Sequence, residues 1–287
     1  MILEVGFIGA GTVGTALAIL LSGRGYRVVA AYSRSRVSAE RLAGLVSGCR
    51  VAAESQDVAE AADLIFITTP DDAIGDVASR VKWRPGSSVV HCSGADSTEV
   101  LGPASRDGAA VGAFHPLQTF AGVERALENI PGSTFAIEAE EPLLTTLNEM
   151  AAALGGRSIR LQAGDKVLYH AAAVFASNYL VTLVKMATDL WQTFSIPTDQ
   201  SVPALLPLLR GTLHNIETIG IPNCLTGPIA RGDTGTINKH IEALREKAPE
   251  LLFPYKELGL QTVSIALAKG KITRQQAGEL ELNLKAK

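Results

Sequence analysis

Residues 3–14, with the sequence LEVGFIGAGTVG, decide how the first half of the chain folds. Leu3–Ile8 is a short apolar run typical of a buried parallel strand. Glycines follow at positions 9, 11 and 14, and Val13–Arg24 has the composition of a helix. A strand, a GxGxxG turn and a helix in this order predict a loop that holds the pyrophosphate of a dinucleotide at the N-terminus of the helix.

Every residue of this turn is predicted to contact the cofactor: Gly9, Ala10, Gly11, Thr12, Val13 and Gly14. Gly9 permits the tight turn, and Gly11 lets a pyrophosphate approach the backbone. Gly14 lets the helix pack closely against the strand. The alternative is a glycine-rich turn that has only a structural role.

The end of the second predicted strand, Arg27–Tyr32, indicates which dinucleotide binds. NAD sites usually place an Asp or Glu there to bind the ribose hydroxyls, whereas this chain continues with Ser33, Arg34 and Ser35. No carboxylate would repel a 2′-phosphate, both hydroxyls can hydrogen-bond to it, and Arg34 can form an ion pair with it. These residues therefore predict NADP; the alternative is that Arg34 is an ordinary surface charge.

Strand-like and helix-like stretches alternate through the first half of the chain, which predicts an α/β fold with a doubly wound parallel sheet. The strand-like runs are Leu3–Ile8, Arg27–Tyr32, Leu64–Thr69, Ser88–His91, Ala110–Phe114, Thr134–Ile137 and Ser158–Leu161. From Asp165 onward almost no strand-like run remains. The 287 residues therefore predict a nucleotide-binding domain over residues 1–164 and an all-helical domain for substrate binding and dimerisation over residues 165–287.

Composition and charge exclude several classes of protein. Hydrophobic residues make up 47% of the chain and charged residues 19%, which excludes a disordered protein. The 26 basic and 29 acidic residues give a net charge of −3 without basic blocks, so no nucleic-acid partner is expected. The uncharged stretch Phe7–Gly23 contains glycines and lacks a basic leader, so neither a targeting segment nor a membrane partner is expected.

The three cysteines, Cys49, Cys92 and Cys224, are widely spaced and form no CxxC pair. This pattern fits neither a disulfide framework nor a zinc site. It indicates a reducing, cytoplasmic location, and no metal is expected.

The segment Asp165–Phe194 is predicted to form one long helix that is largely buried, because it is rich in apolar residues. At about 100° per residue, Lys166, His170 and Ser177 lie within roughly 40° of one another on its surface. Burial moves the pKa of a Lys or His toward the working range. The stripe predicts the wall of a cleft, with Lys166 or His170 as general acid/base and Ser177 and Asn178 as substrate ligands. The alternative is a solvated Lys and a hydrogen-bonded core His.

Polar residues also follow the strand-like run that ends at Thr69, at the sheet edge where ligands bind in open α/β sheets. Thr69 and Pro70 are predicted to line the ribose-nicotinamide side of the cofactor. Alternatively, they only begin a helix that Asp71 caps.

Residues that suit substrate binding or catalysis follow two further strand-like runs. Ser93 and Gly94 are candidates for substrate binding, and His115 is a candidate for orienting or polarising the substrate. For each of these residues a structural role is an equal alternative. His91 and Cys92 are expected in the sheet interior.

The loop Leu225–Asp233, LTGPIARGD, is a polar, glycine-rich connection between two predicted helices. Thr226 and Arg231 would suit a substrate carboxylate, because Arg can bind a carboxylate in bidentate fashion. The alternative is a simple connector between two helices.

These stretches together resemble the Rossmann-like oxidoreductases that carry a C-terminal domain of unknown function. The resemblance spans essentially the whole chain, and its most specific parts are His115-Pro116-Leu117 and Leu225-Thr226-Gly227-Pro228. That group is similar in turn to the 6-phosphogluconate and β-hydroxyacid dehydrogenases, prephenate dehydrogenase and pyrroline-carboxylate reductase. The resemblance implies an N-terminal Rossmann domain, a helical C-terminal domain like that of 6-phosphogluconate dehydrogenase, and usually a homodimer formed through those helices.

The resemblance assigns roles to only some residues. Lys166 matches the catalytic Lys of β-hydroxyacid dehydrogenases, but His170 stands where they have an Asn. Ser93-Gly94 resembles the start of their substrate-binding Ser-Gly-Gly, with Ala95 in place of the last Gly. His115 and the Pro after it resemble the His-Pro motif of prephenate dehydrogenase.

Three functions are compatible with these residues. The first is an NADP(H)-dependent oxidoreductase that transfers a hydride between nicotinamide and a small, anionic hydroxy/keto or amino/imino substrate in an interdomain cleft. The alternative is a non-catalytic, NADP-sensing regulatory protein that binds a partner through its helical domain. A methyltransferase is the third possibility. It is disfavoured because those enzymes usually need a carboxylate after the second strand, and this chain has none there.

Overall fold

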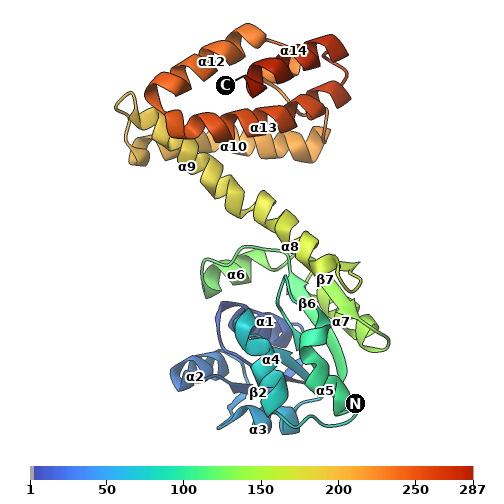
Figure 1. The fold of residues 1–287 in the computed structure, drawn as a ribbon. Helices are drawn as coiled ribbons and strands as arrows, with labels where there is room; N and C mark the ends of the chain where they lie inside the picture. Colours follow the sequence, from blue (N-terminus) through green and yellow to red (C-terminus); the bar gives the residue numbers. More distant parts are fainter. Residues whose placement is uncertain (1–2, 287) are drawn as a thin grey trace. The chain divides into compact units, whose positions relative to one another are not determined.

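The structure is a computed structural model that describes residues 3–286 of the chain. It divides into two compact units, Met1–Ser177 and Asn178–Lys287. The first unit is built around a sheet, and the described part of the second contains only helices (Figure 1). The α/β class followed by a helical region is therefore confirmed. The domain limits 1–164 and 165–287 stay a prediction.

The sheet of the first unit has eight strands in the order β3-β2-β1-β4-β5-β6-β7-β8. The strands are β1 (Glu4–Ile8), β2 (Arg27–Tyr32), β3 (Arg50–Val51), β4 (Leu64–Ile67), β5 (Ser88–His91), β6 (Ala110–Pro116), β7 (Thr134–Ala139) and β8 (Arg157–Arg160). Neighbouring strands are parallel except β6 and β7, which run antiparallel. The sequence did not predict this reversal, nor β3, which is too short to show a periodic pattern.

Each face of the sheet carries its own hydrophobic core. In β4, Leu64 and Phe66 belong to one core and Ile65 and Ile67 to the other, because successive side chains of a strand point to opposite faces. The first core includes residues of α1 (Thr12–Gly23), α2 (Arg36–Leu45), α6 (Val123–Asn129) and α7 (Leu143–Ala153). The second includes residues of α3 (Ser55–Ala61), α4 (Asp71–Arg80), the 3-10 turn Thr98–Leu101 and α5 (Gly102–Arg106). Helices therefore cover both faces, as predicted.

The strand order reverses between β1 and β4, which are neighbours in the sheet. Ile8 of β1 pairs with Tyr32 of β2 and with Ile67 of β4, so the three strands end at the same level. In open α/β sheets, ligands bind outside the carboxyl ends of the strands at such a reversal. This topology therefore places the glycine turn at the expected ligand site.

The segment predicted as one long helix forms two, α8 (Asp165–Ala176) and α9 (Asn178–Gln192), with a break at Ser177. Its apolar side chains are largely exposed, since Leu168 is 77% and Val181 71% accessible. The prediction of a largely buried helix is therefore wrong for the single chain. By length and composition alone, Asp165–Gln192 is also apolar enough to cross a membrane.

The second unit continues with further helices around a small core. They are α10 (Thr198–Ile219), α11 (Pro228–Arg231), α12 (Thr234–Lys247), α13 (Pro249–Ala268) and α14 (Arg274–Lys285). Ile237 of α12, Val263 of α13 and Leu280 of α14 are buried in this core. Figure 1 shows the three helices. Ile229 of α11 packs on the same core, so it anchors the loop that carries Thr226 and Arg231.

Candidate functional site

The turn after β1 requires glycine at two positions for steric reasons. Gly9 has φ +111°, and a Cβ atom there would lie 2.6 Å from the backbone carbon of Thr68. A Cβ atom on Gly14 would lie 2.5 Å from the carbonyl oxygen of Gly9 and 2.3 Å from Thr68 Oγ1. The Thr68 hydroxyl donates a 2.7 Å hydrogen bond to that same carbonyl. The turn therefore packs directly on the end of β4.

Gly11 differs from the other two glycines, because nothing lies within 4 Å of the Cβ position it lacks. It is the N-cap of α1, no side chain caps the helix there, and the first turn carries no acidic residue. The first N–H groups of a helix have no partner within the helix and give its N-terminus a partial positive charge. Uncapped donors at the helix start, with open space beside Gly11, suit a phosphate group.

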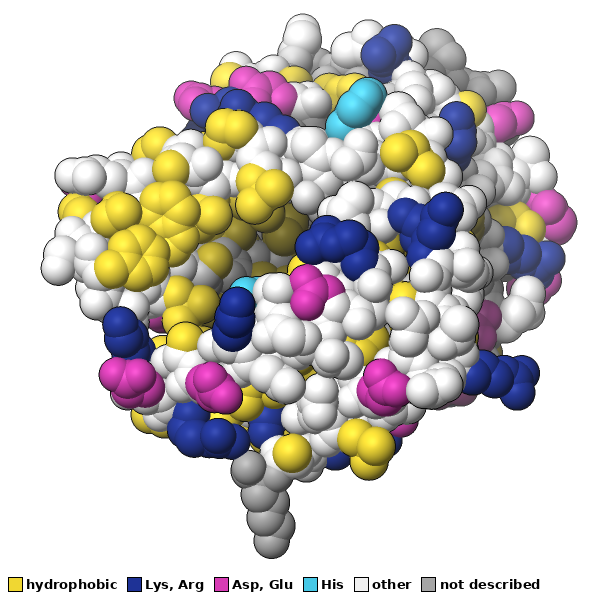
Figure 2. Space-filling model, turned by 90° about the horizontal axis from the view of Figure 1, so that it is seen from above, with side chains coloured by type: hydrophobic (Ala, Val, Ile, Leu, Met, Phe, Trp, Pro, Cys, Tyr) yellow, Lys and Arg dark blue, Asp and Glu magenta, His cyan; other side chains and the backbone are white. Residues whose placement is uncertain are grey.

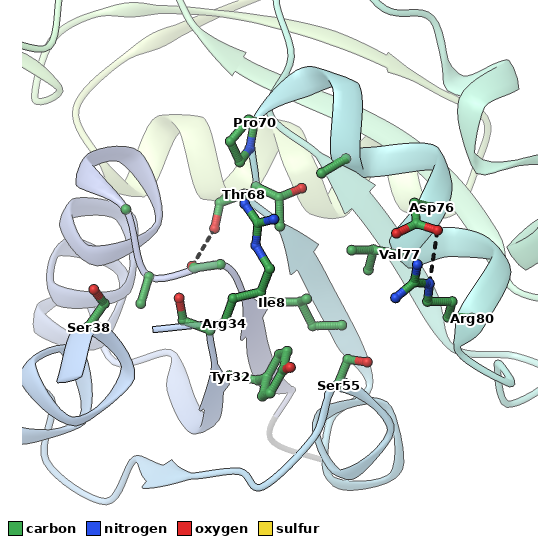
Figure 3. A pocket seen from close by; sticks show the side chains of 16 residues that line it. Ile8, Tyr32, Arg34, Ser38, Ser55, Thr68, Pro70, Asp76, Val77 and Arg80 are labelled. Carbon is green, nitrogen blue, oxygen red and sulfur yellow. Dashed lines mark hydrogen bonds and ion pairs between the residues drawn. The ribbon is translucent and has the colours of Figure 1, made fainter. Parts of the chain in front are cut away.

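A cleft of about 290 Å³ opens beside this turn (Figure 3). Its walls are the ends of β1, β2 and β4, together with α4. Thr69 and Pro70 line it, as the sequence predicts for cofactor-binding residues, and Pro70 is also the N-cap of α4. The Thr69 hydroxyl oxygen is buried without a hydrogen-bond partner in the described structure. A buried hydroxyl of this kind is costly unless a ligand or water satisfies it.

The end of β2 supplies Ser33 and Arg34 to the cleft, and Figure 3 shows the Arg34 side chain extending into it. No acidic residue follows Tyr32 at this position. The carboxylate that does line the cleft, Asp76, is paired with Arg80 at 2.9 Å. These residues therefore leave a basic, hydroxyl-bearing corner, which fits a 2′-phosphate better than a ribose diol alone.

Ser35 lies beside the cleft and caps α2. Its hydroxyl accepts hydrogen bonds from the backbone N–H of Ser38 at 3.3 Å and from the Ser38 hydroxyl at 3.1 Å. Ser38 itself lines the cleft, although the sequence did not single it out. Its position in the sequence could have identified it, because it stands three residues after Ser35, the N-cap of α2.

Lys166, on α8, is the most deeply buried charged side chain of the first unit. Its side chain is 1% accessible, and Nζ donates a 2.5 Å hydrogen bond to the carbonyl oxygen of Ser93. Burial lowers the pKa of Lys166 to about 8, although the nearby carboxylates of Glu138, Asp96 and Asp71 act in the opposite direction. A lysine with this pKa can exchange a proton near neutral pH.

Ser93 links Lys166 to the rim of the cleft. Its hydroxyl donates to Asp71 Oδ2 at 2.8 Å and accepts from the backbone N–H groups of Ala95 and Asp96. Asp71 is the first residue of α4 and follows Pro70 directly. The lysine site and the cleft are therefore adjacent parts of one sheet edge.

His115, at the end of β6, joins two residues of α8. Its Nδ1 lies 2.8 Å from the hydroxyl oxygen of Tyr169, and its ring lies edge-on to that of His170 at 6.4 Å. A Cβ atom on Gly94 would lie 2.7 Å from His170 Cδ2 and 2.9 Å from His115 Nε2. The structure therefore brings the predicted residues Lys166, His170, His115, Ser93 and Gly94 together.

Burial shifts the pKa values of His115 and Tyr169 in opposite directions. Burial lowers the pKa of His115 to about 4, with Lys166 and His170 adding to the effect. Burial raises the pKa of Tyr169 to about 12. Both are therefore neutral at pH 7, and the pair acts through hydrogen bonds rather than through charge.

Two further buried polar groups, His91 and Glu138, interact electrostatically with Lys166. His91 is fully buried in β5, as predicted, and its Nδ1 accepts a 3.1 Å hydrogen bond from the N–H of Ser93. Glu138 of β7 accepts a 2.8 Å hydrogen bond from the Thr98 hydroxyl, and its second oxygen is buried without a partner in the described structure. Glu138 carried no sequence signal, because it looked like an ordinary strand residue.

Most of the remaining predicted substrate ligands belong to the second unit. Ser177 and Asn178 are exposed at the junction of α8 and α9. Thr226 and Arg231 line a separate cavity of about 490 Å³ in the second unit. Among residues 3–286, no group of three or more His, Cys, Asp or Glu side chains could hold a metal ion.

Two family models match the chain. Residues 1–116 match a Rossmann-like domain, and residues 133–262 match a domain of unknown function, DUF2520. None of the curated proteins compared with the chain matches it.

Solved structures resemble the chain over most of its length. A Bacteroides fragilis protein described as a candidate NADP oxidoreductase is 26% identical, with a TM-score of 0.72, covering 91% of this chain and 98% of its own. A Thermotoga maritima protein is 25% identical, with a TM-score of 0.75, covering 93% of this chain and 99% of its own. A reductive aminase from Aspergillus terreus, crystallised with NADPH and ethyl levulinate, shares the fold at 17% identity, with a TM-score of 0.67, covering 98% and 99%. The chain therefore combines a Rossmann-like domain with a DUF2520 domain and is similar to solved NADP oxidoreductases, as its motifs predict.

Proposed function

We propose that this chain is an NADP(H)-dependent oxidoreductase acting on a small, anionic hydroxy/keto or amino/imino substrate. The observation that carries the proposal is one sheet edge that joins a phosphate-binding turn to a buried lysine through the 2.8 Å hydrogen bond between Ser93 and Asp71. The B. fragilis relative supports the activity class. NADP is also bound in a Plasmodium falciparum pyrroline carboxylate reductase that shares the fold at 14% identity, with a TM-score of 0.59.

The proposed cofactor residues form three groups, each assigned to a different part of NADP. The backbone N–H groups at Gly11–Gly14 would hold the pyrophosphate, because no side chain caps the start of α1 and nothing lies within 4 Å of the Cβ position that Gly11 lacks. Ser33 and Arg34 would bind the 2′-phosphate, with Ser35 keeping that corner in place through its cap on α2. Thr69 and Pro70 would contact the ribose-nicotinamide part. NADPH bound there supplies the hydride.

Lys166 is the general acid/base in this proposal, because burial brings its pKa to about 8. His170 is the alternative acid/base, since it lies beside His115 at the same edge. His115 is neutral at pH 7 and would orient the substrate by a hydrogen bond, with Tyr169 fixing its ring. Ser93, with the backbone at Gly94, would position the substrate beside them.

The remaining substrate contacts are assigned on chemistry alone. Ser177 and Asn178 offer polar side chains at the junction of α8 and α9, and Thr226 and Arg231 offer a hydroxyl and a guanidinium that suit a carboxylate. The three cysteines are free thiols in the structure, which supports a cytoplasmic location.

The exposed apolar surface of α8 and α9 supports a homodimer. Val167, Leu168 and Val181 are each at least 66% accessible there. Figure 2 shows hydrophobic side chains gathered over one side of the face in view. Large exposed apolar patches mark interaction surfaces, so the same observation keeps the alternative of an NADP-sensing regulatory protein that binds a different partner. The burial of Lys166 favours the enzyme, because a binding protein has no need of a desolvated, titratable lysine.

A fluorescence titration with NADPH and NADH tests the cofactor assignment. We expect NADPH to bind at least about tenfold more tightly, a difference of about 1.4 kcal/mol. Arg34→Ala should abolish that preference, because it removes the cation that pairs with the 2′-phosphate. Arg41→Ala, an exposed arginine of α2 outside the cleft, should keep the preference. If neither nucleotide binds the wild-type chain, the oxidoreductase assignment is wrong.

A further inference from the structure

The second unit contains a cavity of its own with an unusual charge. It measures about 490 Å³ and is lined by Leu225, Thr226, Gly227, Ala230, Arg231, Lys269 and Lys271. Three of these residues are basic and none is acidic, in a chain whose net charge is −3. Its volume is that of a small-molecule site rather than a packing defect.

The loop that forms one wall of the cavity is held in a fixed shape. Gly227 and Gly232 both have positive φ, at +97° and +69°, which favours glycine. A Cβ atom on Gly232 would lie 2.8 Å from the Gln276 side chain of α14. The backbone between them is anchored by Ile229, which packs in the core of the unit.

Lys269 fixes the opposite wall to this loop. It follows the last residue of α13, and its Nζ donates a 2.7 Å hydrogen bond to the carbonyl oxygen of Leu225. The ammonium group is therefore held beside Thr226, whose hydroxyl is a further donor at the cavity. Lys269 is only partly exposed, so its charge is incompletely solvated.

The other two cations have no ion-pair partner among the described residues. Arg231 and Lys271 are exposed, and neither forms a salt bridge within residues 3–286. The nearest carboxylate along the loop, Asp233, interacts electrostatically with Arg231 without forming a salt bridge, and it caps α12 by accepting hydrogen bonds from the N–H and hydroxyl of Thr236 at 2.9 and 2.7 Å. Three cations on one cavity repel each other, and an anion would relieve that repulsion.

We propose that this cavity binds a small molecule carrying two negative charges, through Arg231, Lys269, Lys271 and the Thr226 hydroxyl. Arg231 offers paired N–H donors to a carboxylate or phosphate, and the lysines offer point charges. The inference deepens one part of the proposed function, the anionic character of the substrate. It does not depend on NADP, because all its residues belong to the second unit.

Calorimetric titration of the full chain without cofactor tests the site. The probes are inorganic phosphate, succinate and, as a monoanion, acetate, all at one ionic strength. Arg231→Gln and Lys271→Gln each remove one exposed charge from the cavity. Arg210→Gln is the matched control, because it removes an exposed charge from α10 outside the cavity. Thermal unfolding shows whether each variant is folded.

We expect phosphate or succinate to bind more tightly than acetate, and each cavity variant to weaken that binding at least about tenfold while Arg210→Gln leaves it unchanged. The preferred dianion identifies the recognised group as phosphate or dicarboxylate. Three results would overturn the inference: no binding of either dianion, equal binding of acetate, or equal loss in the Arg210 variant. Because no nucleotide is present, failure here leaves the NADP assignment standing, and failure of NADPH binding leaves this site standing.

Discussion

The glycine turn and the lysine cluster lie at the same sheet edge but are built in opposite ways. The turn is a contiguous piece of backbone whose shape depends on missing atoms, since a Cβ on Gly14 would lie 2.5 Å from the Gly9 carbonyl. The cluster is assembled from side chains far apart in the chain, and Lys166 reaches Ser93 across 73 residues. The turn should therefore be sensitive to added volume, and the cluster to lost charge and hydrogen bonds.

The largest expected effect is the loss of turnover when the charge of Lys166 is removed. Lys166→Met keeps the length of the side chain and removes its titratable group, so turnover should fall by about a hundred- to ten-thousandfold. The NADPH affinity should stay within about threefold, because Lys166 does not line the cleft. Steady-state kinetics and a fluorescence titration measure the two quantities separately.

Lys185→Met is the matched control for this substitution. Lys185 lies on the exposed surface of α9, where it pairs with Asp189, so its loss should leave turnover unchanged. His170→Ala tests the alternative acid/base. If Lys166→Met and His170→Ala both keep full activity, neither residue is the acid/base.

The next effect comes from adding one methyl group to the turn. Gly14→Ala should reduce the free energy of unfolding by about 1–3 kcal/mol, because its Cβ would lie 2.3 Å from Thr68 Oγ1. Gly11→Ala should change stability by less than about 1 kcal/mol, since its Cβ would meet open space. Both substitutions should weaken NADPH binding about a hundredfold, which corresponds to roughly 2.7 kcal/mol. Gly11→Ala would do so because its methyl group occupies the space of the pyrophosphate.

Thermal unfolding together with an NADPH titration separates these two glycines. Gly44→Ala, on the exposed side of α2, serves as the control and should weaken neither property. Normal NADPH binding by the Gly11 variant would mean that no ligand approaches the turn, and the glycines would then be structural only.

A third effect is the pH dependence that burial gives to Lys166. Its pKa falls from 10.5 to about 8, so above pH 8 the lysine can no longer donate a proton. In the direction of reduction, kcat/KM should therefore fall about tenfold per pH unit above pH 8. His115 has a pKa of about 4 and should add no step between pH 5 and about 8. A profile that is flat through pH 9 would contradict the role of Lys166.

The same shift has a consequence for stability. Between about pH 8 and 10.5 the unfolded chain keeps a proton on Lys166 that the folded chain has lost. The free energy of unfolding should therefore rise with pH across this window, and the full cost of the buried charge is present below it. Denaturant unfolding of the wild type, compared with Lys166→Met, isolates this contribution.

The difference between the two regions also explains how far the sequence could be used. The turn was predicted residue by residue, because the roles of Gly9, Gly11 and Gly14 depend on neighbours a few positions away. Lys166 and His170 were recognised from helical spacing and, for Lys166, also from the family resemblance. Glu138, whose carboxylate acts on the pKa of Lys166, was not, because the sequence does not show that β7 lies beside β6 in the sheet.

The long helical segment was misjudged for a related reason. Its apolar composition predicted burial, but composition does not say whether the covering surface belongs to the same chain. Leu168 and Val181 are exposed in the single chain, although apolar side chains of this kind are typical of a buried helix face. Tyr169 was overlooked on the same helix, because a tyrosine among apolar residues reads as packing.

Tyr169 therefore supplies the smallest and most specific prediction. Tyr169→Phe removes the hydroxyl that lies 2.8 Å from His115 Nδ1, while the edge-on ring contact at 5.6 Å is kept. A single neutral hydrogen bond contributes about 0.5–1.5 kcal/mol, so turnover should fall only about two- to tenfold, with NADPH affinity unchanged.

Tyr255→Phe is a closely matched control in the second unit. Tyr255 makes the same 2.8 Å contact with His240 Nδ1, and its ring lies edge-on at 5.9 Å. If the His115–Tyr169 pair is part of the reaction site, only the Tyr169 variant should slow turnover. Equal effects of both variants would mean that each tyrosine merely steadies a histidine for packing. The lysine cluster would then depend on charge alone, without the hydrogen-bonded orientation assigned to His115.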